Sequence, residues 1–409
     1  MLVAILLLAL GSWSAIATIN ALHPFRQTVV LFPSMFWSWF VIGLPGQHVF
    51  FQMVLAGFLI WLGALEHIIG WAGLVLLVFS WAGTVLLISR TANSRHVVDA
   101  ALAKAHVTRS GPSVPIWRIL LAAPLRGRRV EKIKNVPFTR VAGHIVKLDV
   151  YRDTTDRTDR PVFVYIHGGG WVIGDKREQG LPLLHHMARA GWLCFSLNYR
   201  LSPGAGWPDQ LVDVKSGLAW IREHAAEHGG DPSFVAVSGG SAGGHLAALV
   251  GLTENDPRYQ RGFESADTSV QVVVPIYGIY DVTNRLGAQS NRFVPMLMEP
   301  LVMKAFLDDE PEKFRDASPI DQVRTDVPPF VVAHGDRDSL APVVEARAFV
   351  RRLEETSHER VVYMEFPGAQ HIFDLAYSYQ SAQMVEGVCS ILNDACAHVR
   401  DSKSPGDPV

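Results

Sequence analysis

The first 89 residues of this 409-residue chain almost lack charge. Arg26 and Glu66 are their only Lys, Arg, Asp or Glu residues, although the whole chain holds 37 basic and 39 acidic ones. A water-soluble domain needs many charged and polar residues on its surface, so this part of the chain is not such a domain. The asymmetry predicts a membrane region followed by a soluble region.

Cysteine is scarce, and the net charge is close to zero. The three cysteines, Cys194, Cys389 and Cys396, cannot all pair, and their spacing suits neither a zinc site nor a disulfide framework. The formal net charge of −2 gives the chain no global attraction to nucleic acid. We therefore expect no nucleic-acid partner.

Four apolar stretches fill the N-terminal region: residues 1–22, 29–44, 48–65 and 71–89. The first is long enough to cross a bilayer and lacks the basic start of a secretory signal. We interpret it as a retained helix, with a cleaved signal as the alternative. The second is short and contains Pro33, which leaves open whether it spans, re-enters or lies at the interface. We expect three or four spans.

Basic residues follow the last apolar stretch, at Arg90, Arg95, Lys104 and Arg109. Loops rich in Lys and Arg stay on the cytoplasmic side of a membrane. We therefore expect a multi-pass membrane protein whose soluble region lies in the cytoplasm.

Residues 91–137 form a basic connection between the membrane region, residues 1–90, and the soluble region. A helix-like start is followed by a break at residues 110–115 and then by residues 116–129, which mix apolar side chains with arginine. A basic amphipathic stretch near a span can lie on anionic lipid. It can also cap an active site, and the sequence leaves both interpretations open.

Residues 138–399 alternate short β-prone apolar runs with helical ones. This alternation, with nearly continuous apolar strands, indicates an α/β fold whose mainly parallel sheet is flanked by helices. In such sheets, functional residues lie beyond the carboxyl ends of the strands. We expect residues 400–409 to form a flexible tail.

A Gly-x-Ser-x-Gly motif follows the apolar run 234–238 and passes directly into an Ala-rich helix. This context of strand, turn and helix is that of a nucleophile elbow, which makes Ser241 the candidate nucleophile. Gly239 and Gly243 would let the neighbouring strand and helix pass without a Cβ clash.

Further polar motifs follow other strand-like runs. The stretch His167-Gly-Gly-Gly-Trp171 offers backbone N–H groups that could stabilise an oxyanion. Asp336 and Asp338 lie in one polar turn, where either could orient a histidine, and His371 lies in a later loop. The order of Ser241, an aspartate and His371 along the chain is that of α/β-hydrolases.

Residues from about 140 to 399 resemble the α/β-hydrolase family, in the branch of esterases similar to hormone-sensitive lipase. The matching motifs are His167-Gly-Gly-Gly-Trp171, Asn198-Tyr-Arg-Leu-Ser-Pro203, Gly239-Gly-Ser-Ala-Gly-Gly244, His334-Gly-Asp-Arg-Asp338 and His371-Ile-Phe373. The chain departs from this pattern at Gly240, where many relatives carry Asp or Glu before the serine.

The resemblance implies roles for individual residues. Ser241 would be the nucleophile and His371 the base, with Asp338 rather than Asp336 as the acid that orients it. The resemblance assigns the oxyanion-hole N–H groups to Gly169, Gly170 and Ala242.

The resemblance also implies a function, that of a serine carboxylesterase or lipase. The apolar N-terminal region lies outside the resemblance, and with it we expect a membrane-anchored enzyme. Such an enzyme would hydrolyse short- to medium-chain acyl esters through an acyl-enzyme. Its substrate would be a small-molecule or lipid ester, with membrane lipid as a further partner and no metal or organic cofactor. Amide or formamide hydrolysis and prenylcysteine-type methyl ester hydrolysis are alternatives on this fold, as is a binding module without catalysis. The oligomeric state stays open.

Overall fold

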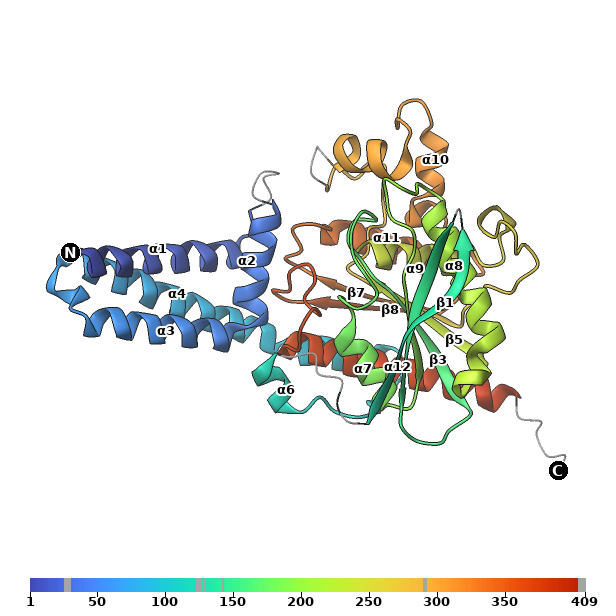
Figure 1. Ribbon diagram of the computed structural model, residues 1–409, viewed down its shortest axis with the longest axis horizontal. Helices are drawn as coiled ribbons and strands as arrows, with labels where there is room; N and C mark the ends of the chain where they lie inside the picture. The colour runs from blue at the N-terminus through green and yellow to red at the C-terminus, as the bar shows by residue number, and fades with distance from the viewer. Residues whose placement is uncertain (26–30, 123–126, 128, 142, 290–292, 404–409) are drawn as a thin grey trace.

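The computed structural model consists of a helical bundle and an α/β region that lie end to end (Figure 1). It describes residues 1–409 except 26–30, 123–126, 128, 142, 290–292 and 404–409. The N-terminus lies at the end of the bundle that is farther from the α/β region (Figure 1). The uneven distribution of charge along the chain therefore corresponds to two structurally different parts.

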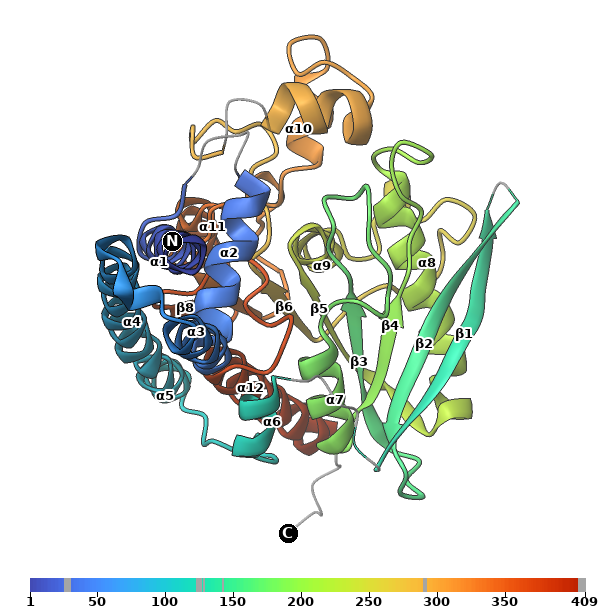
Figure 2. The same ribbon diagram turned by 60° about the vertical axis from the view of Figure 1, so that its left-hand side comes forward.

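Three long helices run side by side in the bundle, and a fourth crosses their end (Figures 1 and 2). The long helices are α1 (Leu2–Leu22), α3 (Pro45–Trp61) and α4 (Ile68–Ala92), and the crossing helix is α2 (Leu31–Gly43). The chain bends by 93° between α2 and α3. Pro45 at the start of α3 favours this break because proline cannot continue the preceding helix.

By length and apolar composition, α1 and α4 can each cross a membrane, and α2 with α3 would give a third crossing if the bent pair is one span. The described residues thus give two or three candidate spans rather than the three or four that we expected. The stretch 29–44 forms the crossing helix instead of a span, with residues 29 and 30 outside the described residues. The physical reason is length, since α2 has 13 residues and a span needs about 20.

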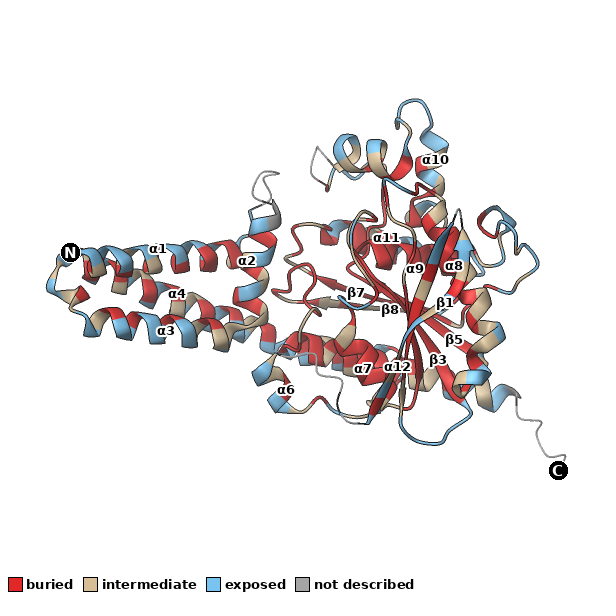
Figure 3. Cartoon of the chain, in the orientation of Figure 1, coloured by how far each residue is buried: buried red, intermediate tan, exposed pale blue. Residues whose placement is uncertain are grey.

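The bundle is apolar on its outside and partly polar inside. Large apolar side chains are exposed on the long helices, for example Trp13, Phe51 and Val75, and Figure 3 shows exposed residues along the outer sides of α1 and α3. Inside, Thr18 of α1 and Ser80 of α4 share a hydrogen bond of 2.8 Å. Proteins in water rarely leave so much apolar surface uncovered, whereas lipid would cover it.

Eight strands form one sheet in the order β1-β2-β4-β3-β5-β6-β7-β8. The strands are β1 (Val130–Val141), β2 (His144–Asp153), β3 (Arg160–Ile166), β4 (Leu193–Leu197), β5 (Gly230–Gly240), β6 (Val272–Ile276), β7 (Phe330–Gly335) and β8 (Val361–Phe366). β2 is antiparallel to both of its neighbours, and the other neighbouring pairs are parallel. This arrangement confirms the expected α/β fold with a mainly parallel sheet.

Helices cover both faces of the sheet. One face packs against α5 (Ser94–Lys104), α7 (Leu181–Arg189) and α12 (Tyr379–Lys403), and the other against α8 (Asp209–His224), α9 (Ala242–Leu252) and α11 (Val343–Thr356). The shorter helices are η1 (Ala64–Glu66), α6 (Ile116–Leu121), η2 (Ala225–His228), η3 (Pro257–Tyr259), η4 (Val294–Met303), α10 (Pro311–Asp316) and η5 (Pro319–Asp321). Because α12 continues to Lys403, the tail expected from residue 400 begins as helix. Residues 404–409 lie outside the described residues.

The connection 91–137 is largely built into the α/β region. Val98 and Leu102 of α5 are buried in the core beside α12, and β1 pairs with β2 from Val130 onward. The boundary that we expected at residue 138 is therefore too late. The charges of Glu131 and Lys132 obscured β1 in the sequence, and charged side chains are typical of such an edge strand.

The described residues of the connection do not cap the pocket around Ser241. No residue of 91–137 that the structure describes, which leaves out 123–126 and 128, lines that pocket. The cap interpretation of this segment therefore has no support in the described residues.

Candidate active site

The nucleophile elbow forms where β5 meets α9. Ser241 has φ 57° and ψ −122°, a conformation that costs a non-glycine residue about 1–3 kcal/mol. A Cβ on Gly243 would lie 2.1 Å from the carbonyl oxygen of Ile166, and a Cβ on Gly239 would lie 2.3 Å from the carbonyl oxygen of Gly243. Only glycine fits at these two positions, as predicted, because strand and helix backbones approach so closely.

Ser241, His371 and Asp338 form a continuous hydrogen-bonded chain. His371 Nε2 lies 2.9 Å from Ser241 Oγ, and His371 Nδ1 lies 2.6 Å from Asp338 Oδ2. Asp338 Oδ1 accepts hydrogen bonds from the N–H groups of Leu340 at 2.9 Å and Ala341 at 2.7 Å. A histidine that donates its Nδ1–H to the carboxylate has Nε2 available to accept the serine proton.

Asp336, the other acidic candidate, is not part of this chain. Its Oδ1 accepts a hydrogen bond of 2.6 Å from the N–H of Gly368, in the loop that carries His371. Burial raises the pKa of the Asp336 carboxyl above its ordinary value. Asp336 therefore joins two loops, whereas Asp338 contacts the imidazole.

The glycine-rich loop lies directly against the elbow. A Cβ on Gly168 would be 3.0 Å from the Cβ of Ser241, so a larger residue would push the loop away. The loop is supported from behind by Tyr199 of the Asn198–Pro203 motif, whose hydroxyl donates to the carbonyl oxygen of His167 at 3.1 Å. The structure thus brings two motifs of the sequence together behind the nucleophile.

The three expected oxyanion donors lie beside Ser241. Gly169 and Gly170 line the same pocket as Ser241 and His371. Ala242 is the first residue of α9, so its N–H has no acceptor within the helix. Gly169 adopts φ 114°, which only glycine tolerates readily, and this conformation lets the loop turn sharply beside the serine.

A pocket of about 400 Å³ opens beside Ser241 and is lined mainly by apolar side chains. Its apolar lining comprises Met35, Phe36, Val172, Ile173, Ile279, Phe293, Leu297, Leu301, Leu340 and Ile372. Its polar side chains are those of Gln179, Ser241 and His371, and none of the described lining residues is an acid, lysine or arginine. The pocket is therefore suited to an uncharged apolar group next to the reacting serine.

Two of these lining residues, Met35 and Phe36, belong to α2 in the membrane region. Sequence reasoning missed them, because it assigned their stretch only to the membrane. Phe293, Leu297 and Leu301, which lie in or just before η4, also line the pocket.

Two other histidines lie close to the site but bond elsewhere. His245 Nε2 donates to the carbonyl oxygen of Ala317 at 2.7 Å, and its ring packs edge-on against Trp171. Burial lowers the pKa values of His245 and His167 to about 4, so both rings are neutral near pH 7. Among the residues that the structure describes, no cluster of three or more His, Cys, Asp or Glu could hold a metal ion.

Part of this chain is similar in sequence to known proteins. The family model described as BD-FAE matches residues 148–353, about half of the chain. The chain is 45% identical over 269 residues to the probable carboxylic ester hydrolase LipM of Mycobacterium tuberculosis, and 44% identical over 247 residues to the esterase LipQ of the same organism. These matches cover 65% and 60% of this chain but only 62% and 58% of LipM and LipQ.

A solved structure has the same fold. The thermophilic esterase Est2 of Thermogutta terrifontis aligns with a TM-score of 0.54 at 23% identity, over 69% of this chain and 96% of Est2.

The family match spans the glycine-rich loop, Ser241 and Asp338, and His371 follows it. With this match and the strand order of its sheet, the chain belongs to the BD-FAE family of α/β-hydrolases.

Proposed function

We propose that this protein is a membrane-anchored serine carboxylesterase that hydrolyses short- to medium-chain acyl esters. The observation that carries the proposal is the hydrogen-bonded chain from Ser241 through His371 to Asp338, beside a glycine-rich loop. The printed names of LipM and LipQ, a probable carboxylic ester hydrolase and an esterase, support the same reaction class.

The first half of the reaction forms an acyl-enzyme. Ser241 Oγ attacks the carbonyl carbon of the ester while His371 Nε2 takes the hydroxyl proton. The electron pair of the carbonyl bond moves onto its oxygen, where the N–H groups of the glycine-rich loop and the elbow stabilise the charge. The intermediate then expels the alkoxide, which leaves as an alcohol after it receives the proton from His371.

The second half releases the acid. Water gives a proton to His371 Nε2 and attacks the acyl carbon. The second oxyanion then collapses, the bond from the acyl carbon to Ser241 Oγ breaks, and His371 returns the proton to Oγ as the acid leaves. Asp338 accepts the Nδ1–H bond throughout and stabilises the imidazolium that forms twice per cycle. The donors assigned to Gly169, Gly170 and Ala242 serve both oxyanions.

The pocket supports an acyl group of limited length. Its volume of about 400 Å³ falls in the lower part of the usual range for ligand sites, about 300–1,000 Å³. Its apolar lining would contact a hydrocarbon chain, and each buried methylene contributes roughly 0.8 kcal/mol to binding. Short to medium acyl chains are therefore the expected substrates.

The bundle supports a topology with three crossings. We infer that α1, α3 and α4 cross the membrane, that the N-terminus lies outside and that the catalytic region lies in the cytoplasm. The basic residue Arg90 near the end of α4, on the side of the catalytic region, supports this orientation. The buried contact between Thr18 and Ser80 supports a retained rather than a cleaved α1. A membrane-impermeant activity probe should label the protein in opened cells but not in intact ones. Labelling in intact cells would show that the catalytic region lies outside.

The reaction class is tested with a fluorophosphonate probe and a set of substrates. The full-length protein should be labelled, Ser241→Ala should not be, and Ser238→Ala should be. Ser238 is a matched control because it is buried three residues earlier and donates to the carbonyl oxygen of Val274, away from the pocket.

The substrate set consists of nitrophenyl esters from acetyl to dodecanoyl, the matching anilides and a prenylcysteine methyl ester. Short- and medium-chain esters should react fastest. Faster turnover of an anilide would indicate an amide hydrolase instead of an esterase. Faster turnover of the prenylcysteine ester would indicate a methylesterase. A folded protein that neither reacts with the probe nor hydrolyses any substrate would favour a binding module.

A further inference from the structure

Helix α2 lies across the end of the bundle that faces the α/β region (Figures 1 and 2). Its residues Met35 and Phe36 line the pocket that contains Ser241 and His371. Met35 is buried in the core of the α/β region, whereas 48% of the Phe36 surface is exposed. A helix of the membrane region thus forms one wall of the site where chemistry is expected.

Asn20, near the end of α1, holds α2 in this crossing position. Asn20 Nδ2 donates to the carbonyl oxygen of Ser34 at 2.7 Å and to Ser38 Oγ at 2.8 Å. Asn20 Oδ1 accepts from Ser34 Oγ at 2.7 Å and from the N–H of Phe25 at 2.9 Å. Because Asn20 and the two serines are buried, these hydrogen bonds have no competition from water. The wall is therefore fixed to the helix that anchors the protein.

The pocket has exposed apolar residues on the side of α2. Ile173, in the loop after the glycine-rich turn, lines the pocket and is 69% exposed. Together with Phe36 it leaves two large apolar side chains partly exposed at the pocket. Apolar residues in such a position favour contact with lipid over contact with water.

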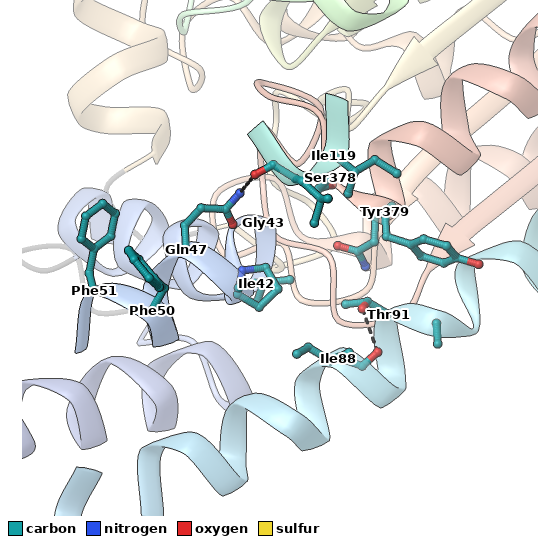
Figure 4. Close-up of a pocket in the computed structure, with 15 residues that line it drawn as sticks. Ile42, Gly43, Gln47, Phe50, Phe51, Ile88, Thr91, Ile119, Ser378 and Tyr379 are labelled. Atoms are coloured by element: carbon teal, nitrogen blue, oxygen red, sulfur yellow. Dashed lines mark hydrogen bonds between the residues drawn. The ribbon is translucent and has the colours of Figure 1, made fainter. Parts of the chain in front are cut away.

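The apolar surface of the bundle continues onto the catalytic region at a second cavity, of about 650 Å³. Figure 4 shows this cavity, which lies between Phe50 and Phe51 of α3, Ile88 of α4 and the start of α12. Gln47 crosses it and donates to the carbonyl oxygen of Leu120 in α6, whose apolar side chain is 66% exposed. The exposed apolar surface of the bundle therefore reaches the catalytic region next to the bend between α2 and α3.

We propose that the active site takes its substrate from the bilayer and that this substrate is a lipid ester with a hydrocarbon chain. The chain enters beside Phe36 and Ile173, so that its ester group reaches Ser241 without passing through water. This inference rests on the proposed esterase function and adds the class and source of its substrate. An acyl chain that stays in apolar surroundings avoids a cost of about 0.8 kcal/mol for each methylene exposed to water.

The test compares two esters in the full-length protein, reconstituted in phosphatidylcholine vesicles. One is didecanoylglycerol, which resides in the bilayer, and the other is nitrophenyl acetate, which dissolves in water. Phe36→Ser removes the apolar wall, and Phe40→Ser is the matched control. Phe40 lies on the same helix and is 38% exposed, and it does not line the pocket.

Phe36→Ser should lower hydrolysis of didecanoylglycerol about tenfold, the effect expected for losing one large apolar contact. Hydrolysis of nitrophenyl acetate should fall much less, because its acetyl group has no hydrocarbon chain to place against this wall. Circular dichroism checks that the variant is folded. Phe40→Ser should change neither rate, and Phe36→Leu should restore the rate on didecanoylglycerol. Equal loss on both esters, or no loss on either, would overturn the proposal.

Dilution of the substrate within the membrane gives an independent measurement. Adding phosphatidylcholine vesicle lipid at a constant amount of didecanoylglycerol should slow hydrolysis, because the surface concentration of the ester falls. A rate that stays constant would mean that the enzyme does not draw its substrate from the bilayer. Failure of the esterase function itself would look different, because Ser241→Ala would then hydrolyse nitrophenyl acetate as fast as the wild type.

Discussion

Tyr277 occupies the space into which a side chain on Gly240 would project. A Cβ built on Gly240 would lie 2.6 Å from the Tyr277 hydroxyl oxygen and 2.8 Å from its nearest ring carbon. The same ring lies 4.8 Å from that of His371, measured between centroids. The departure from the usual Asp or Glu before the nucleophile therefore has a steric reason, since the tyrosine fills that position behind the elbow.

Gly240→Ala should destabilise the protein, because the added methyl group and the Tyr277 ring cannot both fit. Overpacking of this kind costs about 1–3 kcal/mol. Urea unfolding of the detergent-solubilised protein measures the loss. In combination with Tyr277→Ala, the effect of Gly240→Ala should become smaller than in the wild-type background, as expected for neighbours that clash. Additive effects of the two substitutions would contradict this account.

Asp338→Asn should lower kcat about 10⁴-fold, because an amide can no longer hold His371 in the productive tautomer. Asp336→Asn is the matched control, two residues away in the same turn. Its amide oxygen can still accept the N–H of Gly368, so kcat should change little. Rates of ester hydrolysis distinguish the two variants, and circular dichroism checks that both are folded. Equal losses for both variants would mean that the roles of the two aspartates are not divided as described.

The elbow and the glycine-rich loop could be predicted because their signals are local. The strand, tight turn and helix follow one another directly, and a Cβ on Gly239 would meet the backbone of Gly243 four residues later. The contact of Gly243 with Ile166 on β3 adds a restriction that is not local. The choice between Asp336 and Asp338 could not be derived from spacing, because both follow the same strand. It depends on how the turn folds, with the N–H groups of Leu340 and Ala341 directed at one carboxylate.

The contribution of α2 to the pocket could not be predicted from the sequence. Hydropathy identified residues 29–44 as apolar but could not say what covers them. The contact between Phe36 and the pocket depends on the 93° bend before α3 and on hydrogen bonds from Asn20, which lies in a mostly apolar helix. A single buried Asn among apolar residues is a weak signal until its partners are known.

Stability should depend on pH through Asp374, which is fully buried and accepts a hydrogen bond from the Tyr277 hydroxyl. Burial raises the pKa of this carboxyl from 3.8 to about 6. As pH rises from about 4 to about 6, the unfolded chain loses this proton and the folded protein keeps it. The free energy of unfolding should therefore fall by about 3 kcal/mol across that window.

Asp374→Asn removes this titration, so the variant should lack that part of the pH dependence. Asp308→Asn, at an exposed position, should keep the wild-type pH profile. Urea unfolding between pH 4 and pH 7 measures all three proteins. If Asp374→Asn keeps the wild-type dependence of stability on pH, other groups cause that dependence.

Two glycines of the bundle should differ sharply in their tolerance of a side chain. A Cβ on Gly73 would lie 2.6 Å from the backbone of Leu7, where α4 packs against α1, whereas nothing lies within 4 Å of a Cβ on Gly57. Gly73→Leu should therefore force the two helices apart and lower the thermal midpoint in detergent, while Gly57→Leu should not.

If α1 shifts, Asn20 can no longer hold α2 in place. Gly73→Leu should then also slow hydrolysis of didecanoylglycerol in vesicles more than that of nitrophenyl acetate. Equal midpoints for the two variants would show that the helices are not in contact at Gly73.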